Sequence, residues 1–277
     1  MKKLNKINRP VLVKVPFING LGKTKGCEIS PDKIVNTIPE IWCNESLKPI
    51  KKTEEIFNIK KINVFNENAS KSIEAIFNES KKIFSEKSKQ KIIFLGGDHS
   101  ISFPITNAFN SCFKNSAFII LDAHADCMKP MQEPTHEEWL RALIEKTKVN
   151  PRNIFIIGLR NIYKDELCFL KQKKIKYFTT KDFFENRNKI EKELKKFMKK
   201  FKNIYLSLDI DLIDPVFTPG ISYEEPCGLT SREGLSLFQK IISNKNIKAI
   251  DINEVNSFND SKNKTTKLAT KFLCELI

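Results

Sequence analysis

Short apolar runs recur along the whole chain, and their pattern predicts the strands of a buried sheet. Each run is rich in Ile, Val and Phe and is bounded by polar residues, which is typical of strands covered on both faces. The eight predicted strands are residues 11–15, 62–65, 92–95, 117–121, 154–157, 175–178, 204–208 and 247–252.

Between these runs, apolar residues recur at helical spacing. Two stripes are the clearest, one of Ile73, Ile76, Phe77, Ile83 and Phe84 and one of Ile190, Leu194, Phe197, Met198 and Phe201. A last helix is predicted from the stripe Leu268, Phe272, Leu273 and Leu276. We also predict a helix that begins with Ser30 as its N-cap and Pro31 as its first residue.

Strands and helices alternate without a linker or an internal repeat. This alternation predicts an α/β protein, a three-layer α/β/α sandwich around an eight-stranded, mostly parallel sheet. We expect a single domain over residues 1–277, because α/β folds of this length commonly form one domain.

The composition fits a globular chain but includes a strong positive charge. The 277 residues are 40% hydrophobic and 29% charged, with a formal net charge of +15 at pH 7. Such a charge is compatible with nucleic acid or an anionic membrane as a partner. The excess is mostly Lys, however. In the Lys-rich stretch 189–202 the lysines alternate with the apolar stripe, and no aromatic residues stand on the polar face. We interpret this stretch as a solvated helix face and expect no nucleic-acid partner.

Cysteine usage and hydropathy point to a cytoplasmic protein. The seven cysteines form no C-x-x-C pair, which argues against a secreted disulfide framework. Residues 1–10 lack the apolar region of a signal peptide, and no apolar run is long enough to span a bilayer. We therefore expect no membrane partner.

The three histidines lie within residues 99–136, beside a group of aspartates. Asp122, His124 and Asp126 follow the predicted strand 117–121 at alternate positions, and alternate side chains of extended backbone share one face. Asp209 and Asp211 repeat this spacing after strand 204–208. Because parallel strands end at the same edge of a sheet, we expect these groups to converge there.

Four neighbouring aspartates require a cation, because like charges at close range raise one another's pKa and are costly to bury. Carboxylate oxygen and imidazole nitrogen suit Mn²⁺, Zn²⁺ or Fe²⁺, and no cysteines stand at metal-ligand spacing. Two divalent ions would balance the four carboxylates, which makes two-metal hydrolysis a plausible chemistry.

Several motifs now combine into a family resemblance. They are Gly96-Gly97-Asp98-His99-Ser100, Asp122-Ala123-His124-Ala125-Asp126, Ser207-Leu208-Asp209-Ile210-Asp211, Asp214-Pro215 and Glu254 in Asp251-Ile252-Asn253-Glu254-Val255-Asn256. In this order they resemble the ureohydrolase family, the arginases and agmatinases, from about Lys91 to the end of the chain. The resemblance implies an arginase-like fold, a small guanidino substrate that is hydrolysed to urea and an amine, and a homo-oligomer, either a trimer or a hexamer.

The resemblance also implies the roles of individual residues. It makes His99, Asp122, Asp126 and Asp209 ligands of one Mn²⁺, and Asp122, His124, Asp209 and Asp211 ligands of the other, with two ions per chain. Asp126 would also transfer a proton, Glu254 would bind the guanidinium, and His136 would shuttle protons to solvent. The alternative for His136 is a surface histidine at a helix start. Asp98 is expected to orient the loop or His99 rather than to do chemistry.

The choice of substrate depends on one carboxylate, which arginine has and agmatine lacks. The loop 127–135 lacks the Ser-Gly-Asn stretch with which arginases bind that carboxylate, and this favours an agmatinase-like substrate. Two residues leave arginine open, since Lys129 in this loop could bind a carboxylate and Asn161 stands where arginases tend to offer an acid. Formiminoglutamate and other guanidino acids also remain open.

Two other functions are alternatives to a ureohydrolase, namely nucleic-acid binding and zinc-dependent amide hydrolysis. A basic nucleic-acid-binding protein on a degenerate enzyme fold would be expected to have lost one of the six ligands, yet all six are present. A zinc amidohydrolase such as a deacetylase would use one metal ion, whereas the six candidate ligands match two.

Overall fold

The computed structural model describes residues 9–65, 67–86 and 90–277. Its strands form one eight-stranded sheet in the order β2-β1-β3-β8-β7-β4-β5-β6. Every neighbouring pair in this sheet is parallel. The strands are β1 (Val11–Val15), β2 (Asn58–Lys61), β3 (Ile92–Gly96), β4 (Ser116–Leu121), β5 (Ile154–Leu159), β6 (Lys176–Thr179), β7 (Asn203–Asp209) and β8 (Ile247–Asn253). The predicted fold class is therefore confirmed.

One strand lies elsewhere than predicted. The pattern placed a strand at residues 62–65, but β2 covers Asn58–Lys61. The Ile62 N–H directly after β2 still donates to the Lys14 carbonyl oxygen at 2.9 Å. The strand β2 lies at the edge of the sheet, where its side chains are exposed or half-buried. An edge strand of this kind carries no buried apolar run, so hydropathy alone pointed to its neighbour.

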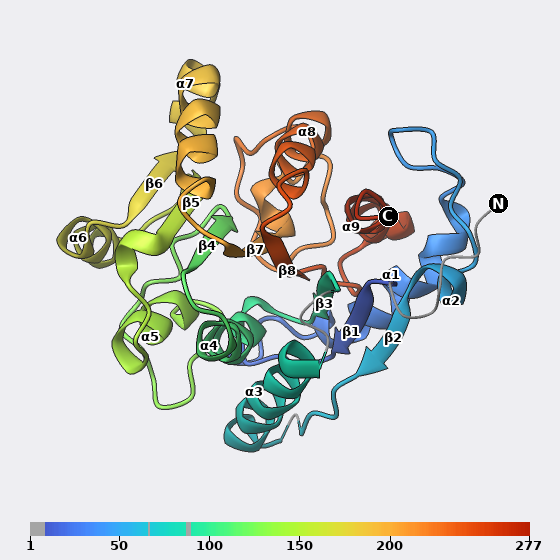
Figure 1. The fold of residues 1–277 in the computed structure, drawn as a ribbon, viewed down its shortest axis with the longest axis horizontal. Coiled ribbons are helices and arrows are strands. Elements are labelled where there is room, and N and C mark those ends of the chain that lie inside the picture. The colour runs from blue at the N-terminus through green and yellow to red at the C-terminus, as the bar shows by residue number, and fades with distance from the viewer. Residues whose placement is uncertain (1–8, 66, 87–89) are drawn as a thin grey trace.

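Helices cover both faces of the sheet and make three layers (Figure 1). One face carries α1 (Ser30–Thr37), α7 (Thr180–Met198), α8 (Ser231–Ile242) and α9 (Lys264–Cys274), and the other carries α3 (Ala69–Glu86), α4 (Ser102–Cys112), α5 (Trp139–Lys146) and α6 (Lys164–Lys173). The short helix α2 (Thr53–Ile56) precedes β2. Strand residues alternate between the two layers of core, as Leu12 packs into one and Val13 into the other.

The predicted helix α1 is present, but it begins at Ser30 rather than at Pro31, so the predicted N-cap is wrong. Ser30 is the first residue of the helix, because the 3-10 helix Cys27–Ile29 runs directly into it. The Ser30 hydroxyl donates instead to the Val255 carbonyl oxygen and lies 2.8 Å from the Ser257 hydroxyl. This serine thus ties the amino-terminal part of the chain to the segment that follows β8.

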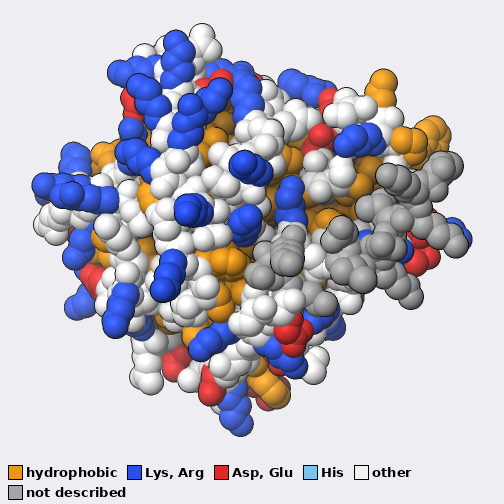
Figure 2. All heavy atoms as spheres, in the orientation of Figure 1, with side chains coloured by type: hydrophobic (Ala, Val, Ile, Leu, Met, Phe, Trp, Pro, Cys, Tyr) orange, Lys and Arg blue, Asp and Glu red, His pale blue; other side chains and the backbone are white. Residues whose placement is uncertain are grey.

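The basic stretch of the sequence forms a solvated helix surface, as predicted. Lysine side chains of α7 are exposed while its apolar stripe is buried, and Figure 2 shows Lys and Arg side chains gathered over this helix. Within the described residues, no helix is both long and apolar enough to cross a membrane.

The strand order explains where the polar motifs meet. The four central strands are β3, β8, β7 and β4. His99 follows β3, Asp122 follows β4, Asp209 ends β7 and Glu254 follows β8. Because all four strands run in the same direction, these residues arrive at one edge of the sheet.

Candidate active site

His99 lies at the centre of the first group of ligand atoms. Its Nδ1 is 3.1 Å from Oδ2 of Asp122, 3.0 Å from Oδ2 of Asp126 and 3.2 Å from Oδ2 of Asp209. All four side chains are buried. Of these, His99, Asp122 and Asp126 converge closely enough to hold one metal ion together.

His124 forms the second group. Its Nδ1 is 2.8 Å from Oδ2 of Asp211 and 3.8 Å from Oδ1 of Asp122, and these three residues could hold a second ion. Asp122 belongs to both groups and faces each with a different oxygen atom. A carboxylate in this position is suited to bridge two cations.

The backbone around these ligands is shaped by their own carboxylates. Asp209 caps the 3-10 helix Ile210–Leu212, and its Oδ1 accepts the Asp211 N–H at 2.8 Å. Asp211 therefore lies on a helical turn, so the extended-backbone argument was wrong for this residue even though its side chain converges. Asp126 has a positive φ of 49°, which is uncommon for a residue other than glycine, so the extended-backbone argument was wrong for this residue as well. Its Oδ2 nevertheless lies 3.0 Å from Nδ1 of His99.

The charges of the cluster perturb one another strongly. Burial, together with the charges of Asp126 and Asp211, raises the pKa of Asp122 to about 7. Burial opposes the protonation of His124, but the neighbouring Asp211 carboxylate raises its pKa to about 11. Burial likewise opposes the protonation of His99, but the surrounding carboxylates raise its pKa well above the usual value. The site therefore attracts positive charge.

The donor atoms fit divalent cations. Nδ1 of His99 and Oδ2 of Asp122 are buried, and neither forms a hydrogen bond within the described residues. Buried polar atoms without a hydrogen bond are costly, and a metal ion would satisfy both. Imidazole nitrogen and carboxylate oxygen suit Mn²⁺, Zn²⁺ or Fe²⁺ better than a metal that prefers thiolate.

A buried hydrogen-bond network orients the His99 ring. Nε2 of His99 lies 2.8 Å from Oγ of Ser207, and that hydroxyl donates to Oδ1 of Asp251 at 2.6 Å. Asp251 also accepts hydrogen bonds from Tyr205 Oη at 2.7 Å and Ser102 Oγ at 2.6 Å. Since Ser207 uses its proton on Asp251, it accepts one from Nε2, which leaves the Nδ1 lone pair for a metal.

Sequence reasoning missed the roles of Ser207 and Asp251. The signal for Ser207 was present, because it lies two residues before Asp209 on the strand β7 and so shares its face. Asp251 lies on β8, and the sequence does not indicate that β8 neighbours β7.

Glu254 enters the site from the end of β8. It has a positive φ of 65°, its N–H donates to the Gly97 carbonyl oxygen at 3.0 Å, and its Oε1 accepts the His99 N–H at 2.7 Å. Its Oε2 lies 3.9 Å from Sγ of Cys27. Burial first, and then the charge of Asp98, raise the pKa of the Glu254 carboxyl well above its usual range.

Asp98 organises the loop that carries His99, as predicted. It caps the 3-10 helix His99–Ile101, and its Oδ1 accepts the Ser100 N–H at 3.1 Å. Its Oδ2 accepts the Asn19 N–H and the Thr24 hydroxyl, both at 2.7 Å. With these donors satisfied, Asp98 is a structural residue of the loop.

His136 is buried beside the ligand cluster. Its ring lies 5.4 Å from that of Tyr223, and it lines a small cavity together with Glu254 and the metal-ligand candidates His99, His124, Asp126, Asp209 and Asp211. Neither ring nitrogen forms a hydrogen bond within the described residues. The alternative of a surface histidine is therefore wrong.

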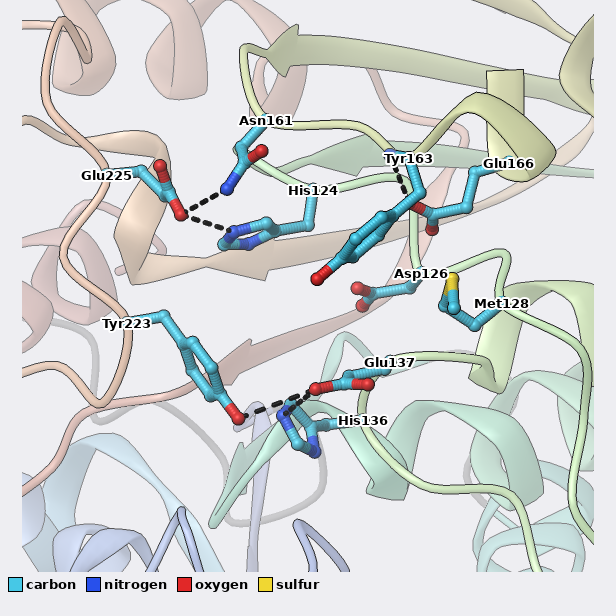
Figure 3. A pocket seen from close by; sticks show the side chains of 10 residues that line it. All are labelled: His124, Asp126, Met128, His136, Glu137, Asn161, Tyr163, Glu166, Tyr223 and Glu225. Atoms are coloured by element: carbon cyan, nitrogen blue, oxygen red, sulfur yellow. Dashed lines mark hydrogen bonds and ion pairs between the residues drawn. The ribbon is translucent and has the colours of Figure 1, made fainter. Parts of the chain in front are cut away.

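A wider cavity of about 90 Å³ opens outside the cluster (Figure 3). Its lining residues are His124, Asp126, Met128, His136, Glu137, Asn161, Tyr163, Glu166, Tyr223 and Glu225. Asn161 lies here as a lining residue and donates from Nδ2 to Oε1 of Glu225 at 2.5 Å. Lys129 is exposed and does not belong to this lining. Sequence reasoning assigned no role to Glu225, Tyr223 or Tyr163, which come from loops without a recognisable pattern.

The sheet and the ligand groups at its edge define an α/β protein with a candidate metal site, and similarity to known proteins identifies its class. The Arginase family model matches residues 8–277, so the chain belongs to the arginase family. The protein is thus a metal-dependent ureohydrolase, an enzyme that hydrolyses a C–N bond of small guanidino compounds.

Individual relatives carry several activities. An agmatinase of Halalkalibacterium halodurans is 29% identical over 215 residues, which cover 76% of this chain and 70% of the relative. An arginase of Staphylococcus aureus is 31% identical over 193 residues, which cover 63% of each chain. The solved structure of formimidoylglutamase from Bacillus subtilis matches with a TM-score of 0.89 at 23% identity, over 97% of this chain and 86% of that one. At this identity the structural match establishes the shared fold alone.

The network behind His99 predicts a defect in metal binding. Ser207→Ala removes the acceptor for Nε2 of His99 and is expected to weaken divalent-metal affinity about 10- to 100-fold without unfolding the protein. Calorimetric titration with Mn²⁺ and circular dichroism measure these two properties. Ser243→Ala, which removes an exposed hydroxyl at the end of α8, is the matched control. Unchanged affinity in Ser207→Ala would show that the network does not support the metal site.

Proposed function

We propose that this protein uses two Mn²⁺ ions per chain to hydrolyse a guanidino compound to urea and an amine, within a single catalytic domain over residues 1–277. The observation that carries the proposal is the pair of ligand groups that share Asp122. A carboxylate with one oxygen in each group supports a binuclear centre rather than a single zinc site.

The proposed ligands follow the two groups. His99, Asp122, Asp126 and Asp209 hold one ion, and Asp122, His124, Asp209 and Asp211 hold the other. The place of Asp209 among the ligands of the first ion is supported by its Oδ2, which lies 3.2 Å from Nδ1 of His99. Two divalent ions offset four carboxylate charges, and they supply a strong oxygen nucleophile at neutral pH when bound.

The remaining groups bind the substrate and move protons. Glu254 lies beside the cluster and binds the guanidinium through charge-assisted hydrogen bonds, which favour its ionised form. The Asp126 carboxylate transfers a proton to the departing amine. Trp139 positions this carboxylate, since its Nε1–H donates a hydrogen bond to Oδ2 of Asp126 at 2.7 Å. His136 exchanges protons with solvent, because its ring reaches both the inner and the wider cavity.

An agmatinase-like substrate is favoured over arginine. None of the ten residues that line the wider cavity is Lys or Arg, so an α-carboxylate would find no cationic partner among them. Arginine and formiminoglutamate are the second candidates, supported by the named activities of an arginase and a formimidoylglutamase among the similar proteins. In those cases Lys129 and Asn161 would contact the carboxylate and the amine of the substrate.

We also propose a cytoplasmic homo-oligomer, a trimer or a hexamer as the family resemblance implies, without a nucleic-acid or membrane partner. The exposed lysines of α7 are compatible with a solvated surface. Binding to RNA at physiological ionic strength would favour the alternative class.

The first prediction for this function is the metal content. Protein reconstituted with Mn²⁺ is expected to retain about two ions per chain, and Asp209→Ala is expected to lose both metal and activity because a bridging ligand is removed. Elemental analysis after gel filtration measures the content. Asp182→Ala removes a capping carboxylate of α7 and is expected to retain both ions. A single tightly bound zinc ion in the wild type would refute the binuclear proposal.

A second prediction concerns Glu254. Glu254→Gln preserves the shape of the side chain but removes the charge that faces the guanidinium. Transition-state binding is therefore expected to weaken by about 2 to 4 kcal/mol, which is measured as a fall in kcat/KM. Steady-state urea release gives this value, and the metal content is expected to stay at the wild-type level. Wild-type catalytic efficiency in the variant would exclude the proposed role.

The third prediction concerns the substrate. Agmatine is expected to exceed arginine in kcat/KM by on the order of 100-fold, because an unpaired carboxylate is costly to desolvate. Urea release from both substrates by the wild type and by Lys129→Ala tests this preference. If the wild type prefers arginine and Lys129→Ala loses that preference, Lys129 binds the carboxylate and the agmatinase assignment is wrong.

A further inference from the structure

The wider cavity has a charge pattern that the proposed chemistry at the cluster does not use. Beyond the cluster residue Asp126, its acidic residues are Glu137, Glu166 and Glu225. Both carboxylate oxygens of Glu166 are occupied, since they accept the N–H groups of Cys127 at 2.8 Å and Tyr163 at 3.0 Å. Glu137 and Glu225 are therefore the acids available to an occupant of the cavity.

Glu225 is held in a defined position. Its Oε1 accepts a hydrogen bond from Asn161, and its backbone carbonyl accepts hydrogen bonds from Nη2 and Nε of Arg160 at 2.8 and 3.1 Å. Arg160 also donates from Nη2 to the Asp211 carbonyl oxygen at 2.6 Å, which ties the loop to the candidate metal ligands. No hydrogen bond between described residues involves Oε2 of Glu225.

A second observation indicates that this cavity takes a polar ligand. The His136 side chain, which is 10% exposed, lines it as well, and both of its ring nitrogens lack a hydrogen bond within the described residues. Figure 3 shows His136, Glu137 and Tyr223 on one side of the cavity and Asn161 and Glu225 on the other. Nε2 of His136 has a 3.8 Å ion-pair contact with Oε1 of Glu137, which is too long for a hydrogen bond. Buried ring nitrogens without a hydrogen bond favour an occupant that offers one.

We propose that Glu225, oriented by Asn161, binds the ammonium end of a substrate whose guanidinium end contacts Glu254. This inference rests on the proposed function and names the class of substrate as an aminoalkylguanidine. The carboxylate provides a charge-assisted hydrogen bond to an ammonium group, and it repels a carboxylate in the same place. Tyr163 and Met128 also line the cavity and provide apolar surface for the methylene chain.

The same carboxylate has a second neighbour, since its Oε1 lies 3.4 Å from Nε2 of His124. Glu225 acting only through His124 would weaken the metal site and would affect all substrates equally. The two roles therefore give different results with a substrate that lacks the ammonium group.

The test compares agmatine with butylguanidine, which has the same carbon chain without the amine. In Glu225→Gln, the KM for agmatine is expected to rise about 10- to 100-fold, while the KM for butylguanidine and the Mn²⁺ content stay unchanged. Glu224→Gln is the matched control, because this neighbouring carboxylate is exposed and lies outside the cavity lining. An equal loss with both substrates, a loss of metal, or no change at all would overturn the proposal.

A binding experiment separates this inference from the proposed function. Calorimetric titration of the Mn²⁺-loaded protein with 1,4-diaminobutane is expected to show binding that weakens about 10- to 100-fold in Glu225→Gln. If the wild type releases urea from no guanidino compound, the proposed function fails, and the diamine titration alone decides the role of Glu225. Absence of diamine binding by the wild type, or equal binding by the variant, would overturn the ammonium site.

Discussion

The burial of four aspartates at one edge of the sheet is the constraint on which the rest of the site depends. Asp122 and Asp211 lie in the same cluster, yet their pKa values shift in opposite directions. The pKa of Asp122 rises to about 7. For Asp211 the charge of His124 overcomes the effect of burial and lowers the pKa to about 2. Such divergence arises because buried carboxylates repel one another and only a nearby cation relieves the repulsion. In this structure, that positive charge comes from His99 and His124, whose pKa values are raised by the carboxylates. Metal ions held by the same residues would supply it instead, with the two histidines as neutral ligands.

The strand order makes this clustering possible, and local backbone geometry completes it. The parallel strands β3, β8, β7 and β4 end side by side, which brings residues from distant parts of the chain to one edge. Asp126 and Glu254 then adopt positive φ values, a backbone conformation that costs on the order of 1 to 3 kcal/mol per residue. The surrounding hydrogen bonds hold these conformations, as the Glu254 N–H bond to the Gly97 carbonyl oxygen illustrates.

The site has an inner and an outer part that are built differently. The inner part consists of residues at or just after the ends of strands, whose positions follow from the sheet and from buried partners such as Ser207 and Asp251. The outer cavity consists mostly of side chains from loops, and Glu225 reaches it from the segment that precedes α8. Because the two parts come from different elements, the charge of the outer wall can change without a change in the ligand cluster at the strand ends.

The sequence by itself determined the fold class, the general position of the central strands and the set of residues that converge as metal-ligand candidates. These features depend on local patterns, since buried strands are apolar runs and the aspartate and histidine motifs directly follow them. Tertiary structure alone decided the rest. Edge strand β2 carries no buried run, Ser30 bonds to the distant Val255 rather than capping its helix, and Asp211 lies on a turn capped by Asp209. The contact of Asn161 with Glu225 joins two loops far apart in the chain, and no local periodicity records such a pairing.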